Sequence, residues 1–396
     1  MLDTVSFRGK KALIRVDFNV PLDENFVVTD ATRISAAAPT IKHILAQGGT
    51  VILMSHLGRP KRGPEDKYSL NHIRGELEKW IGVPVRFFPD CRGVELRQVV
   101  AQLQRGEVLL LENLRFYKEE EEGDTLMAQE LAGLGADYYI NDAFGTAHRA
   151  HASTSIIADF FPPGHKLFGY LMEAEVNNAT KILNAAERPF VAILGGAKVS
   201  DKILLIENLL DRAQHIIIGG GMAYTFFRAM GGNTGKSLVE EDKLEIAHSL
   251  LRKAEEKNVQ LHLPADSIIA DAFAQDAHIQ VCDNMHIPDG WMGLDLGPLA
   301  IARFCSVLAG AKTILWNGPM GVFEMQNFQK GTLSVAQAIA DATASGAFSL
   351  VGGGDSVAAV NGFGLSQRMS YISTGGGAIL EFFEGKELPG VKSILG

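Results

Sequence analysis

Four arginines in the first half of the sequence stand just after short apolar runs, where they could bind a small anion. Arg33, Arg59, Arg115 and Arg149 are accompanied there by polar side chains at Asp17, Asn19, His56, Asn141, Asp142, His148 and His151. Arginine forms planar, bidentate pairs with carboxylate and phosphate groups. A single such arginine more often belongs to a surface ion pair, but four of them at successive strand ends in an acidic protein indicate an anionic small molecule.

Glycine clusters follow the apolar runs of the second half. They are Gly195-Gly196, Gly219 to Gly221, Gly352 to Gly354 and Gly375 to Gly377. Glycine allows backbone N–H groups and helix N-termini to come close to phosphates. A tight turn would explain one cluster equally well, whereas four at the ends of strands in one sheet predict a phosphate site.

Two lysines and two acidic residues lie near these clusters. Lys198 and Lys202 are four residues apart, so we expect them on one face of a helix that begins there, within reach of phosphates. Asp355 closes the third cluster, where a carboxylate beside phosphates suits Mg²⁺. Glu324 is expected to accept hydrogen bonds from a ribose.

Two common phosphate-binding motifs are incomplete. The segment GGNTGKS (231–237) resembles a P-loop, but Met230 stands where the pattern requires its first glycine. The dinucleotide pattern GxGxxG fails after Gly352 and Gly354 because Val357 occupies its third position. The second failure argues against a nicotinamide dehydrogenase.

Short apolar runs that alternate with amphipathic segments predict βαβ units and parallel sheets buried on both faces. Ser69 and Gly82 bracket a helix as cap and C′ residue, and residues 168–185 predict one continuous helix. The expected strands lie within 11–18, 50–56, 85–88, 108–116 and 138–144, and then within 190–198, 215–221, 259–266, 313–321, 348–355 and 371–378.

The bulk properties agree with a folded, soluble enzyme. A chain of 396 residues is too long for one compact core, which predicts two domains. Hydrophobic residues make up 46% and charged residues 21%, as in globular proteins. A formal charge of −9 argues against a nucleic-acid partner. No run approaches the roughly 18 apolar residues of a membrane helix, and no secretory signal pattern is present.

The cysteines and the acidic run suggest no additional site. Cys91, Cys282 and Cys305 are odd in number and far apart, which predicts buried thiols in a reducing cytoplasm rather than disulfides or a zinc site. The run from Lys118 to Asp124 predicts a solvated loop and a helix start.

The sequence resembles the phosphoglycerate kinase family over essentially its whole length. Nine segments match in the same order, namely RVDFNVPL, SHLGRP, LLLENLRF, NDAFGTAHRAHAS, LGGAKVSDK, IGGGMAYTF, LWNGPMGVFE, GGGDS and STGGGA. The resemblance implies reversible phosphoryl transfer between 1,3-bisphosphoglycerate and MgADP, which gives 3-phosphoglycerate and MgATP. It requires no general base, so the histidines need not titrate.

The resemblance also implies roles for individual residues. Arg33 and Lys198 would neutralise the transferred group, with backbone N–H groups near Gly375 and Gly376, and Asp355 would address the metal. Ser356 stands where we expect threonine in some relatives, and its hydroxyl remains. The phosphoglycerate site would comprise Asp17, Asn19, Arg33, His56, Arg59, Arg115 and Arg149; the nucleotide site would comprise Gly196, Lys202, Gly220, Gly221, Gly293, Asn317, Glu324, Gly353, Gly354, Asp355 and Ser356.

The expected fold class is α/β, with two doubly wound, Rossmann-like parallel sheets joined by a helix and an active site in the cleft between the domains. Residues 1–168 would form the phosphoglycerate-binding domain, 169–185 the interdomain helix and 186–379 the nucleotide-binding domain, with a tail of about 380–396 packed back on the first domain. We expect a cytoplasmic monomer without membrane or nucleic-acid partners. An inactive binding protein on the same fold, the physiological direction and the choice between ATP and GTP stay open.

Overall fold

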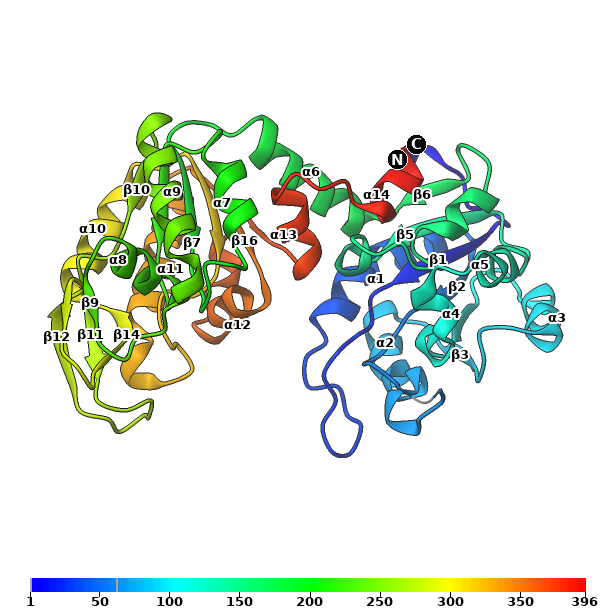
Figure 1. Ribbon diagram of the computed structural model, residues 1–396. Coiled ribbons are helices and arrows are strands. Elements are labelled where there is room, and N and C mark those ends of the chain that lie inside the picture. The colour runs from blue at the N-terminus through cyan, green and yellow to red at the C-terminus, as the bar shows by residue number, and fades with distance from the viewer. Residues whose placement is uncertain (1, 62) are drawn as a thin grey trace. The chain divides into compact units, whose positions relative to one another are not determined.

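A computed structural model describes residues 2–61 and 63–396. The chain divides into two compact units (Figure 1). The first contains the residues up to Asn177 together with Glu387–Gly396, and the second is Asn178–Lys386. The division therefore falls within α6 (Tyr170–Asn184), inside the segment expected to join two domains.

The first unit is built on a six-stranded sheet in the order β3-β4-β2-β1-β5-β6. Every neighbouring pair is parallel, so the carboxyl ends of all six strands lie along one edge. The strands are β1 (Lys11–Val16), β2 (Thr50–Met54), β3 (Val85–Phe88), β4 (Val108–Leu111), β5 (Tyr138–Asp142) and β6 (Lys166–Phe168).

Helices cover this sheet. The α-helices are α1 (Thr32–Ala46), α2 (Arg74–Ile81), α3 (Val94–Gln102), α4 (Lys118–Glu122), α5 (Thr125–Ala132), the start of α6 and α14 (Pro389–Leu395). Short 3₁₀ turns are η1 (Leu2–Thr4), η2 (Asp66–Tyr68), η3 (Leu70–Ile73), η4 (Leu114–Phe116), η5 (Phe144–Thr146) and η6 (Ile156–Phe160).

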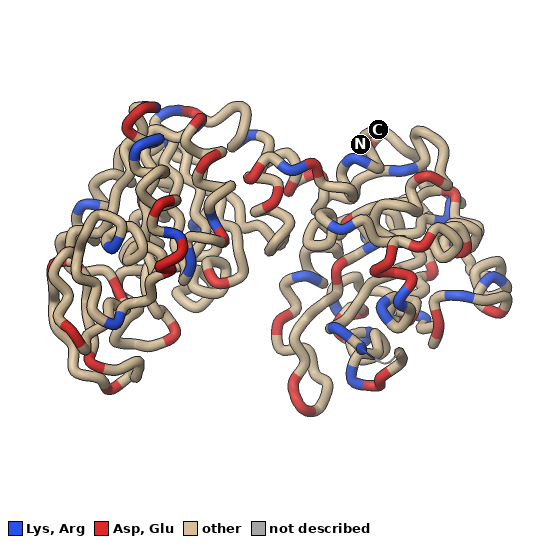
Figure 2. The backbone as a smooth tube through the Cα atoms, viewed as in Figure 1, with Lys and Arg blue, Asp and Glu red and all other residues tan. Residues whose placement is uncertain are grey.

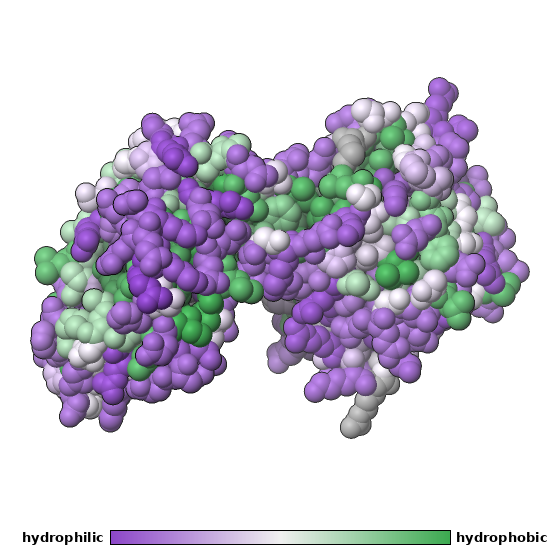
Figure 3. All heavy atoms as spheres, turned by 45° about the horizontal axis from the view of Figure 1, so that its top comes forward, coloured by the Kyte–Doolittle hydropathy of each residue, from purple (hydrophilic) through white to green (hydrophobic). Residues whose placement is uncertain are grey.

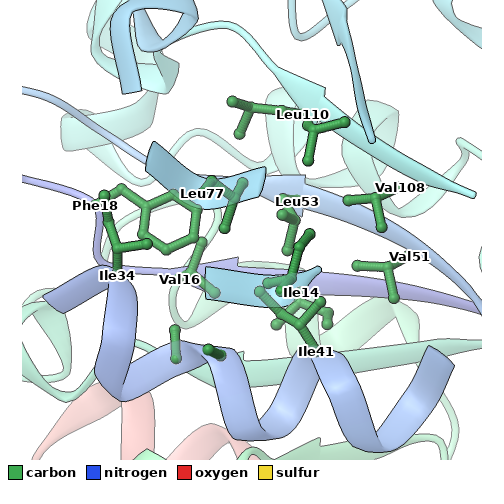
Figure 4. Close-up of a cluster of buried hydrophobic side chains, with 14 of the residues drawn as sticks. Ile14, Val16, Phe18, Ile34, Ile41, Val51, Leu53, Leu77, Val108 and Leu110 are labelled. Atoms are coloured by element: carbon green, nitrogen blue, oxygen red, sulfur yellow. The ribbon is translucent and has the colours of Figure 1, made fainter. Parts of the chain in front are cut away.

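The core explains why the strands read as continuous apolar runs. Ile14 and Val16 of β1 pack with Ile34 and Ile41 of α1 (Figure 4). Leu13 points to the opposite face, as the alternation of a strand requires, and is also fully buried. Both faces of the sheet are therefore covered.

Two predicted helices begin later than expected. Ser69 accepts a hydrogen bond from the Asn71 N–H, but a 3₁₀ turn precedes α2, which then ends at left-handed Gly82. Residues 166–168 form β6, so α6 starts at Tyr170 rather than at residue 168. Between them, a Cβ on Gly169 would lie 2.2 Å from the Asp142 carboxyl, so only glycine allows this close approach.

The second unit repeats the architecture with a six-stranded parallel sheet in the order β10-β8-β7-β15-β16-β17. Its buried core includes Val191, Ile193, Ile314, Trp316 and Val351. The strands are β7 (Phe190–Leu194), β8 (His215–Ile218), β10 (Gln260–His262), β15 (Thr313–Asn317), β16 (Phe348–Gly352) and β17 (Tyr371–Ile372).

The helices of the second unit also follow the strands in alternation. The α-helices are α7 (Ile203–Leu209), α8 (Met222–Ala229), α9 (Leu244–Glu256), α10 (Pro298–Ala309), α11 (Lys330–Ala344), α12 (Gly354–Gly362) and α13 (Gly377–Phe383). The 3₁₀ turns are η7 (Glu241–Lys243), η8 (Gln326–Phe328) and η9 (Ser366–Arg368).

Two small sheets in the second unit were not expected. One is antiparallel in the order β12-β11-β14, and the other pairs β13 with β9. β12 is mostly exposed and so lacks the apolar run that predicts a strand. Their strands are β9 (Asn233–Thr234), β11 (Asp266–Ala270), β12 (Ile279–Asp283), β13 (His286–Ile287) and β14 (Met292–Leu296).

Both large sheets are doubly wound, which confirms the predicted α/β fold class. The chain passes from one side of its first strand to the other between β1 and β5 in the first unit and between β7 and β15 in the second. Open α/β sheets bind ligands beyond the carboxyl ends of the strands at this switch point. Ligands are therefore expected to bind beside the residues that follow β1, β5, β7 and β15.

The surface carries mixed charges. Basic and acidic residues are interspersed along both units (Figure 2), and the face in Figure 3 is largely hydrophilic. None of the helices in the described ranges has the length and hydrophobicity needed to cross a bilayer. Cys91 is buried, but Cys282 and Cys305 are only partly buried, contrary to the expectation of three buried thiols: Cys282 lies on exposed β12, and Cys305 lies on α10 with its thiol 3.8 Å from the Ser334 carbonyl of α11.

Candidate active site

The switch point of the first unit brings together the polar residues that follow β1 and β2. The Arg33 side chain, from the first turn of α1, donates from Nη1 to Asp17 Oδ2 over 2.5 Å. His56 Nδ1 lies 3.9 Å from the other oxygen of Asp17. Asp17 and His56 are both buried, whereas Arg33 is partly exposed. A buried carboxylate thus holds one arginine at the rim of the site.

A second set of contacts fixes Asn19 and Arg115 around the loop after β2. The Gly58 N–H donates to Asn19 Oδ1 over 2.8 Å, and Arg115 Nη1 donates to the Gly58 carbonyl over 3.0 Å. Arg115 also forms an ion pair with Glu121 at 3.3 Å. Arg59, one residue beyond Gly58, is exposed.

The electrostatics of two histidines show that the arginines converge. Burial lowers the pKa of His56 well below its usual value, and the charges of Arg15, Arg115 and Arg33 lower it further while Asp17 opposes them. Burial also lowers the pKa of His151 to about 4, with added effects of Arg15, Arg115 and Arg149. Both imidazoles are therefore neutral near pH 7, in a region of concentrated positive charge.

A buried ion pair beneath this region escaped the sequence analysis. Arg15 and Glu120 are both fully buried, with Arg15 Nη2 3.9 Å from Glu120 Oε1. Ser153 links them, since Arg15 Nε donates to its hydroxyl over 2.8 Å and the hydroxyl donates to Glu120 over 2.6 Å. The prediction of a solvated acidic run was therefore wrong at Glu120. An arginine inside a strand expected to be buried on both faces was the available signal, because such a charge requires a partner.

The polar residues that end β5 serve the scaffold. Asn141 Nδ2 donates to the carbonyls of Thr154 and Gly390, at 3.1 and 3.2 Å. Asp142 Oδ1 accepts from the Met172 N–H over 3.1 Å and so caps α6. Arg149 lies exposed in the loop after β5, next to half-buried His148.

In the second unit, two adjoining pockets open at the switch point. One has a volume of about 660 Å³ and the other about 330 Å³, and they share Gly196, Ala197, Pro319 and Asp355. The larger is also lined by Gly220, Gly221, Gly293 and Glu324. The smaller is also lined by Lys198, Lys202, Asn317, Gly353, Gly354 and Ser356.

In the first two glycine clusters, the N–H groups of Gly196 and Gly220 bond to protein carbonyls, so these two amides do not have the role in phosphate binding that we expected of the clusters. The Gly196 N–H donates to the Pro319 carbonyl over 3.1 Å, and the Gly220 N–H donates to the Met320 carbonyl over 3.1 Å. A Cβ on Gly195 would stand 2.0 Å from the Pro319 carbonyl oxygen. These glycines let the ends of β7 and β8 pack against the loop after β15.

The third glycine cluster, Gly352 to Gly354, differs from the first two because it leads into the N-terminus of a helix. Gly354 begins α12, and a Cβ there would meet nothing within 4 Å. The first turn of a helix has N–H groups without intrahelical partners and favours anions. The N-terminus of α12 in the smaller pocket is therefore suited to phosphate. Ser356 is buried, and its hydroxyl accepts from the Gly318 N–H over 2.6 Å, which ties this turn to the loop after β15.

The two lysines do not share a helix face, contrary to prediction. α7 begins only at Ile203, with Lys202 as its cap residue, and Lys198 lies in the preceding loop. Ser200 anchors this loop by donating to Glu240 over 2.5 Å, which keeps it out of helical conformation. Lys198 is exposed, whereas Lys202 is partly buried and its Nζ contacts Asn317 Oδ1.

The metal candidate, Asp355, lines the smaller pocket together with a second aspartate, Asp201. Asp355 is exposed at the first turn of α12 and lines both pockets. Within the described residues, no group of three or more histidine, cysteine, aspartate or glutamate side chains could hold a metal ion. A carboxylate beside a phosphate site fits Mg²⁺, which uses few protein ligands together with phosphate oxygens and water.

The larger pocket has an apolar wall that sequence analysis missed. It includes Tyr224, Leu238, Leu294, Met320 and Val322. Gly293 is essential to its shape, since a Cβ there would lie 1.9 Å from the Tyr224 hydroxyl oxygen. Apolar side chains of this kind carry no sequence signal that separates a pocket from the core. Gly375 and Gly376 precede α13 and are not among the residues that line either pocket.

Comparison with known proteins identifies one family throughout. A family model described as "Phosphoglycerate kinase" matches residues 2–386. A "Phosphoglycerate kinase" of Porphyromonas gingivalis is 53% identical over 418 aligned residues, covering 100% of both chains. A "Phosphoglycerate kinase, cytosolic" of Nicotiana tabacum is 52% identical, covering 99% of this chain and 97% of the relative.

Solved structures agree with these relatives. A phosphoglycerate kinase from Coxiella burnetii is 41% identical, with a TM-score of 0.90 over 99% of this chain and 98% of that one. A phosphoglycerate kinase from Pyrococcus horikoshii is 31% identical, with a TM-score of 0.82 over 100% of this chain and 98% of that one.

Proposed function

The chain belongs to the phosphoglycerate kinase family, and we propose that its two switch-point sites each bind one substrate of the reaction. The protein is a glycolytic, ATP-binding kinase with phosphoglycerate kinase activity. In our proposal the first unit binds 3-phosphoglycerate or 1,3-bisphosphoglycerate, and the second binds MgATP or MgADP.

The convergence of arginines in the first unit carries the proposal for phosphoglycerate. Arg15, Arg33 and Arg115 all act on His56, and Arg149 acts on His151. Arg15 itself is fully buried and paired with Glu120, so Arg33, Arg115 and Arg149 are the guanidinium groups that suit a ligand with both a phosphate and a carboxylate. Asp17, Asn19 and His56 orient this region, and Arg59 would contact the ligand from the loop after β2.

The pair of pockets in the second unit supports the nucleotide assignment. The larger, with its apolar wall and Glu324, has the character of a nucleoside site, in which Glu324 would accept hydrogen bonds from the ribose. The smaller, with Lys202, Asn317 and the N-terminus of α12, has the character of a phosphate site. Asp355 would hold Mg²⁺, which when bound neutralises charge on the phosphates.

The chemistry that we propose depends on charge neutralisation rather than proton transfer. The carboxylate of 3-phosphoglycerate needs no base to attack a phosphoryl group, which agrees with the low pKa values of His56 and His151. Arg33, in the proposed phosphoglycerate site, and exposed Lys198, in the proposed nucleotide site, would stabilise the transferred phosphoryl group. Backbone N–H groups near Gly375 and Gly376 would aid them. Because the two proposed sites belong to different units, direct transfer requires a closure step on ligand binding.

We also propose that the enzyme is a cytoplasmic monomer. One chain supplies all the residues of both proposed sites, so catalysis needs no second copy. The similarity to a cytosolic relative from tobacco supports the compartment. Light scattering during size-exclusion chromatography tests the oligomeric state, and a dimeric mass would contradict it.

A coupled assay tests the function directly. 3-Phosphoglycerate and MgATP are supplied together with glyceraldehyde-3-phosphate dehydrogenase and NADH, whose oxidation reports the product. We expect NADH oxidation that requires both substrates and Mg²⁺. Binding of both ligands without NADH oxidation would instead identify an inactive binding protein. Replacing ATP with GTP in the same assay determines the nucleotide preference.

A further inference from the structure

Asp295 is a buried carboxylate that none of the proposed roles uses. It lies in β14 and is only 2% exposed. The three preceding residues of the same strand, Met292, Gly293 and Leu294, line the larger pocket. Asp295 therefore sits directly behind the wall of the proposed nucleoside site.

One carboxyl group contacts both ends of a neighbouring segment. The Gly331 N–H, in the first turn of α11, donates to Asp295 Oδ2 over 2.8 Å. The other oxygen, Oδ1, would lie 2.3 Å from a Cβ built on Gly321 and 2.3 Å from a Cβ built on Gly331. Glycine at both positions therefore creates the space that the carboxyl group fills.

The segment between these glycines carries much of the pocket wall. Gly321, Val322, Glu324 and Met325 all line the larger pocket. Its start is held a second time by the Val322 N–H, which donates to the Leu294 carbonyl over 2.9 Å. Glu324 itself is exposed, so the fixed ends of the segment determine where its carboxylate stands.

Burying the Asp295 carboxyl group costs free energy, so the need to fill space in the core does not explain why this residue is an aspartate. Oδ1 is buried without a hydrogen-bond partner among the residues that the structure describes. Burial raises the pKa of the carboxyl group to about 7, opposed by backbone N–H groups of Gly331, Leu296 and Lys330 and by the Lys330 charge. An apolar side chain of similar size would avoid this cost. A carboxyl group nevertheless does here what an apolar side chain could not, because it accepts the Gly331 N–H at the start of α11.

We propose that Asp295 is a positioning residue for the nucleotide site, which fixes both ends of segment 321–331 and thereby places Glu324 against the ribose. This inference rests on the proposed binding of nucleotide in the second unit. It assigns to Asp295 no contact with the nucleotide, so its effect is on nucleotide affinity and not on the transfer step.

The chain offers a matched control in Asp266. It too is a buried carboxylate at a helix N-terminus, accepting from the Leu299 and Ala300 N–H groups at 3.2 and 2.8 Å. A Cβ on Gly297 would lie 2.3 Å from its carboxyl carbon. It caps α10, which does not line the larger pocket. The two aspartates thus share burial and capping but differ in the segment that they hold.

The test compares Asp295→Asn with Asp266→Asn in steady-state kinetics. For Asp295→Asn we expect the KM for MgATP to rise on the order of tenfold, the scale for losing a group that orients ligand contacts, with kcat and the KM for 3-phosphoglycerate within about twofold of wild type. For Asp266→Asn we expect all three constants to stay within about twofold. An unchanged KM for MgATP in folded Asp295→Asn, or the same rise in both variants, would overturn the inference.

A second variant covers the case in which Asp295→Asn does not fold. Gly321→Ala introduces a methyl group against Oδ1, and we expect it to raise the KM for MgATP in the same selective way. An unselective change or no change in this variant would count against the inference. Calorimetric titration with MgADP distinguishes a failure of the proposed nucleotide site from a failure of the proposed role of Asp295. Absence of binding would refute the nucleotide site, whereas equal binding by wild type and Asp295→Asn would refute only the role of Asp295.

Discussion

Arg33 and Asp17 form an ion pair of 2.5 Å that joins the first turn of α1 to the end of β1. Burial alone would raise the pKa of Asp17, but the neighbouring positive charges, Arg33 and Arg15 among them, lower it overall. Asp17 is therefore ionised and compensates the Arg33 charge when no ligand is bound. An incoming anion has to compete with Asp17 for this guanidinium group.

Arg33→Ala should reduce kcat by roughly 10² or more, the scale for losing a charge that stabilises the transition state. The coupled assay measures this reduction. Arg97→Ala is the control, since Arg97 lies exposed on α3, away from the switch point. Near-normal turnover of Arg33→Ala would remove Arg33 from the mechanism.

Lys198 and Lys202 should affect different kinetic constants. Lys198 is exposed in its loop, so Lys198→Ala should lower kcat by roughly 10² with little change in nucleotide affinity. Lys202 contacts Asn317 inside the smaller pocket, so Lys202→Ala should chiefly raise the KM for MgATP. Steady-state kinetics of both variants measure these constants. The same change in kcat and in the KM for MgATP for both variants would contradict the separate roles of the two lysines.

Glu120→Gln should destabilise the first unit by about 3 to 5 kcal/mol, because it leaves the buried Arg15 charge without its partner. Urea denaturation measures the change. Glu122→Gln on the same helix is the control; Glu122 is exposed and pairs only loosely with Lys118, at 4.0 Å. We expect a change within about 0.5 kcal/mol for this variant. A similar loss of unfolding free energy in both variants would show that the buried ion pair stabilises the protein no more than the exposed one.

Gly195→Ala and Gly354→Ala should separate stability from binding. The new Cβ at position 195 would collide with the Pro319 carbonyl, so we expect a loss of about 1 to 3 kcal/mol in thermal or urea unfolding. A Cβ at position 354 would point into open space, so stability should hold while the KM for MgATP rises. Unchanged nucleotide affinity in Gly354→Ala would argue against phosphate at the α12 N-terminus.

Asp142 should make stability depend on pH in a direction opposite to that of most carboxylates. Burial raises its pKa in the folded protein to about 7, above its unfolded value of roughly 3.9. The folded state therefore binds the proton more tightly, and this contribution to stability is present at low pH and declines as pH rises from about 4 to 7. Asp142→Asn should remove the part of the decline that Asp142 contributes, measured as the change in the pH dependence of urea unfolding relative to wild type; Asp295, whose pKa burial also raises to about 7, keeps its own part. An unaltered dependence would show that Asp142 does not titrate in this range.

The sequence predicted the large sheets well because their strands are buried on both faces. β1 and β7, for example, stand out as apolar runs that end in polar or glycine residues. β12 could not be found in this way, since its side chains are mostly exposed and its pairing with β11 depends on tertiary structure. Strands in small half-exposed sheets lack a distinctive local pattern.

The candidate site was predictable where the chemistry needs unusual residues and not where it needs ordinary ones. The arginines and the glycine clusters were conspicuous. The roles of Tyr224 and Asp295 depend on what packs against them, which a linear sequence does not contain. Lys198 and Lys202 were misplaced because a spacing of four residues implies one face only within a helix, and Ser200 ties that segment into a loop.

The hydrogen bonds that Gly196 and Gly220 give to the loop after β15 have a consequence for the speed of nucleotide capture. The floor of the pocket is already ordered by the backbone itself, so little conformational entropy remains to be lost there when the nucleotide arrives. Association at this surface is then limited by diffusion and orientation rather than by folding of the receptor, and rapid exchange of product for substrate becomes possible.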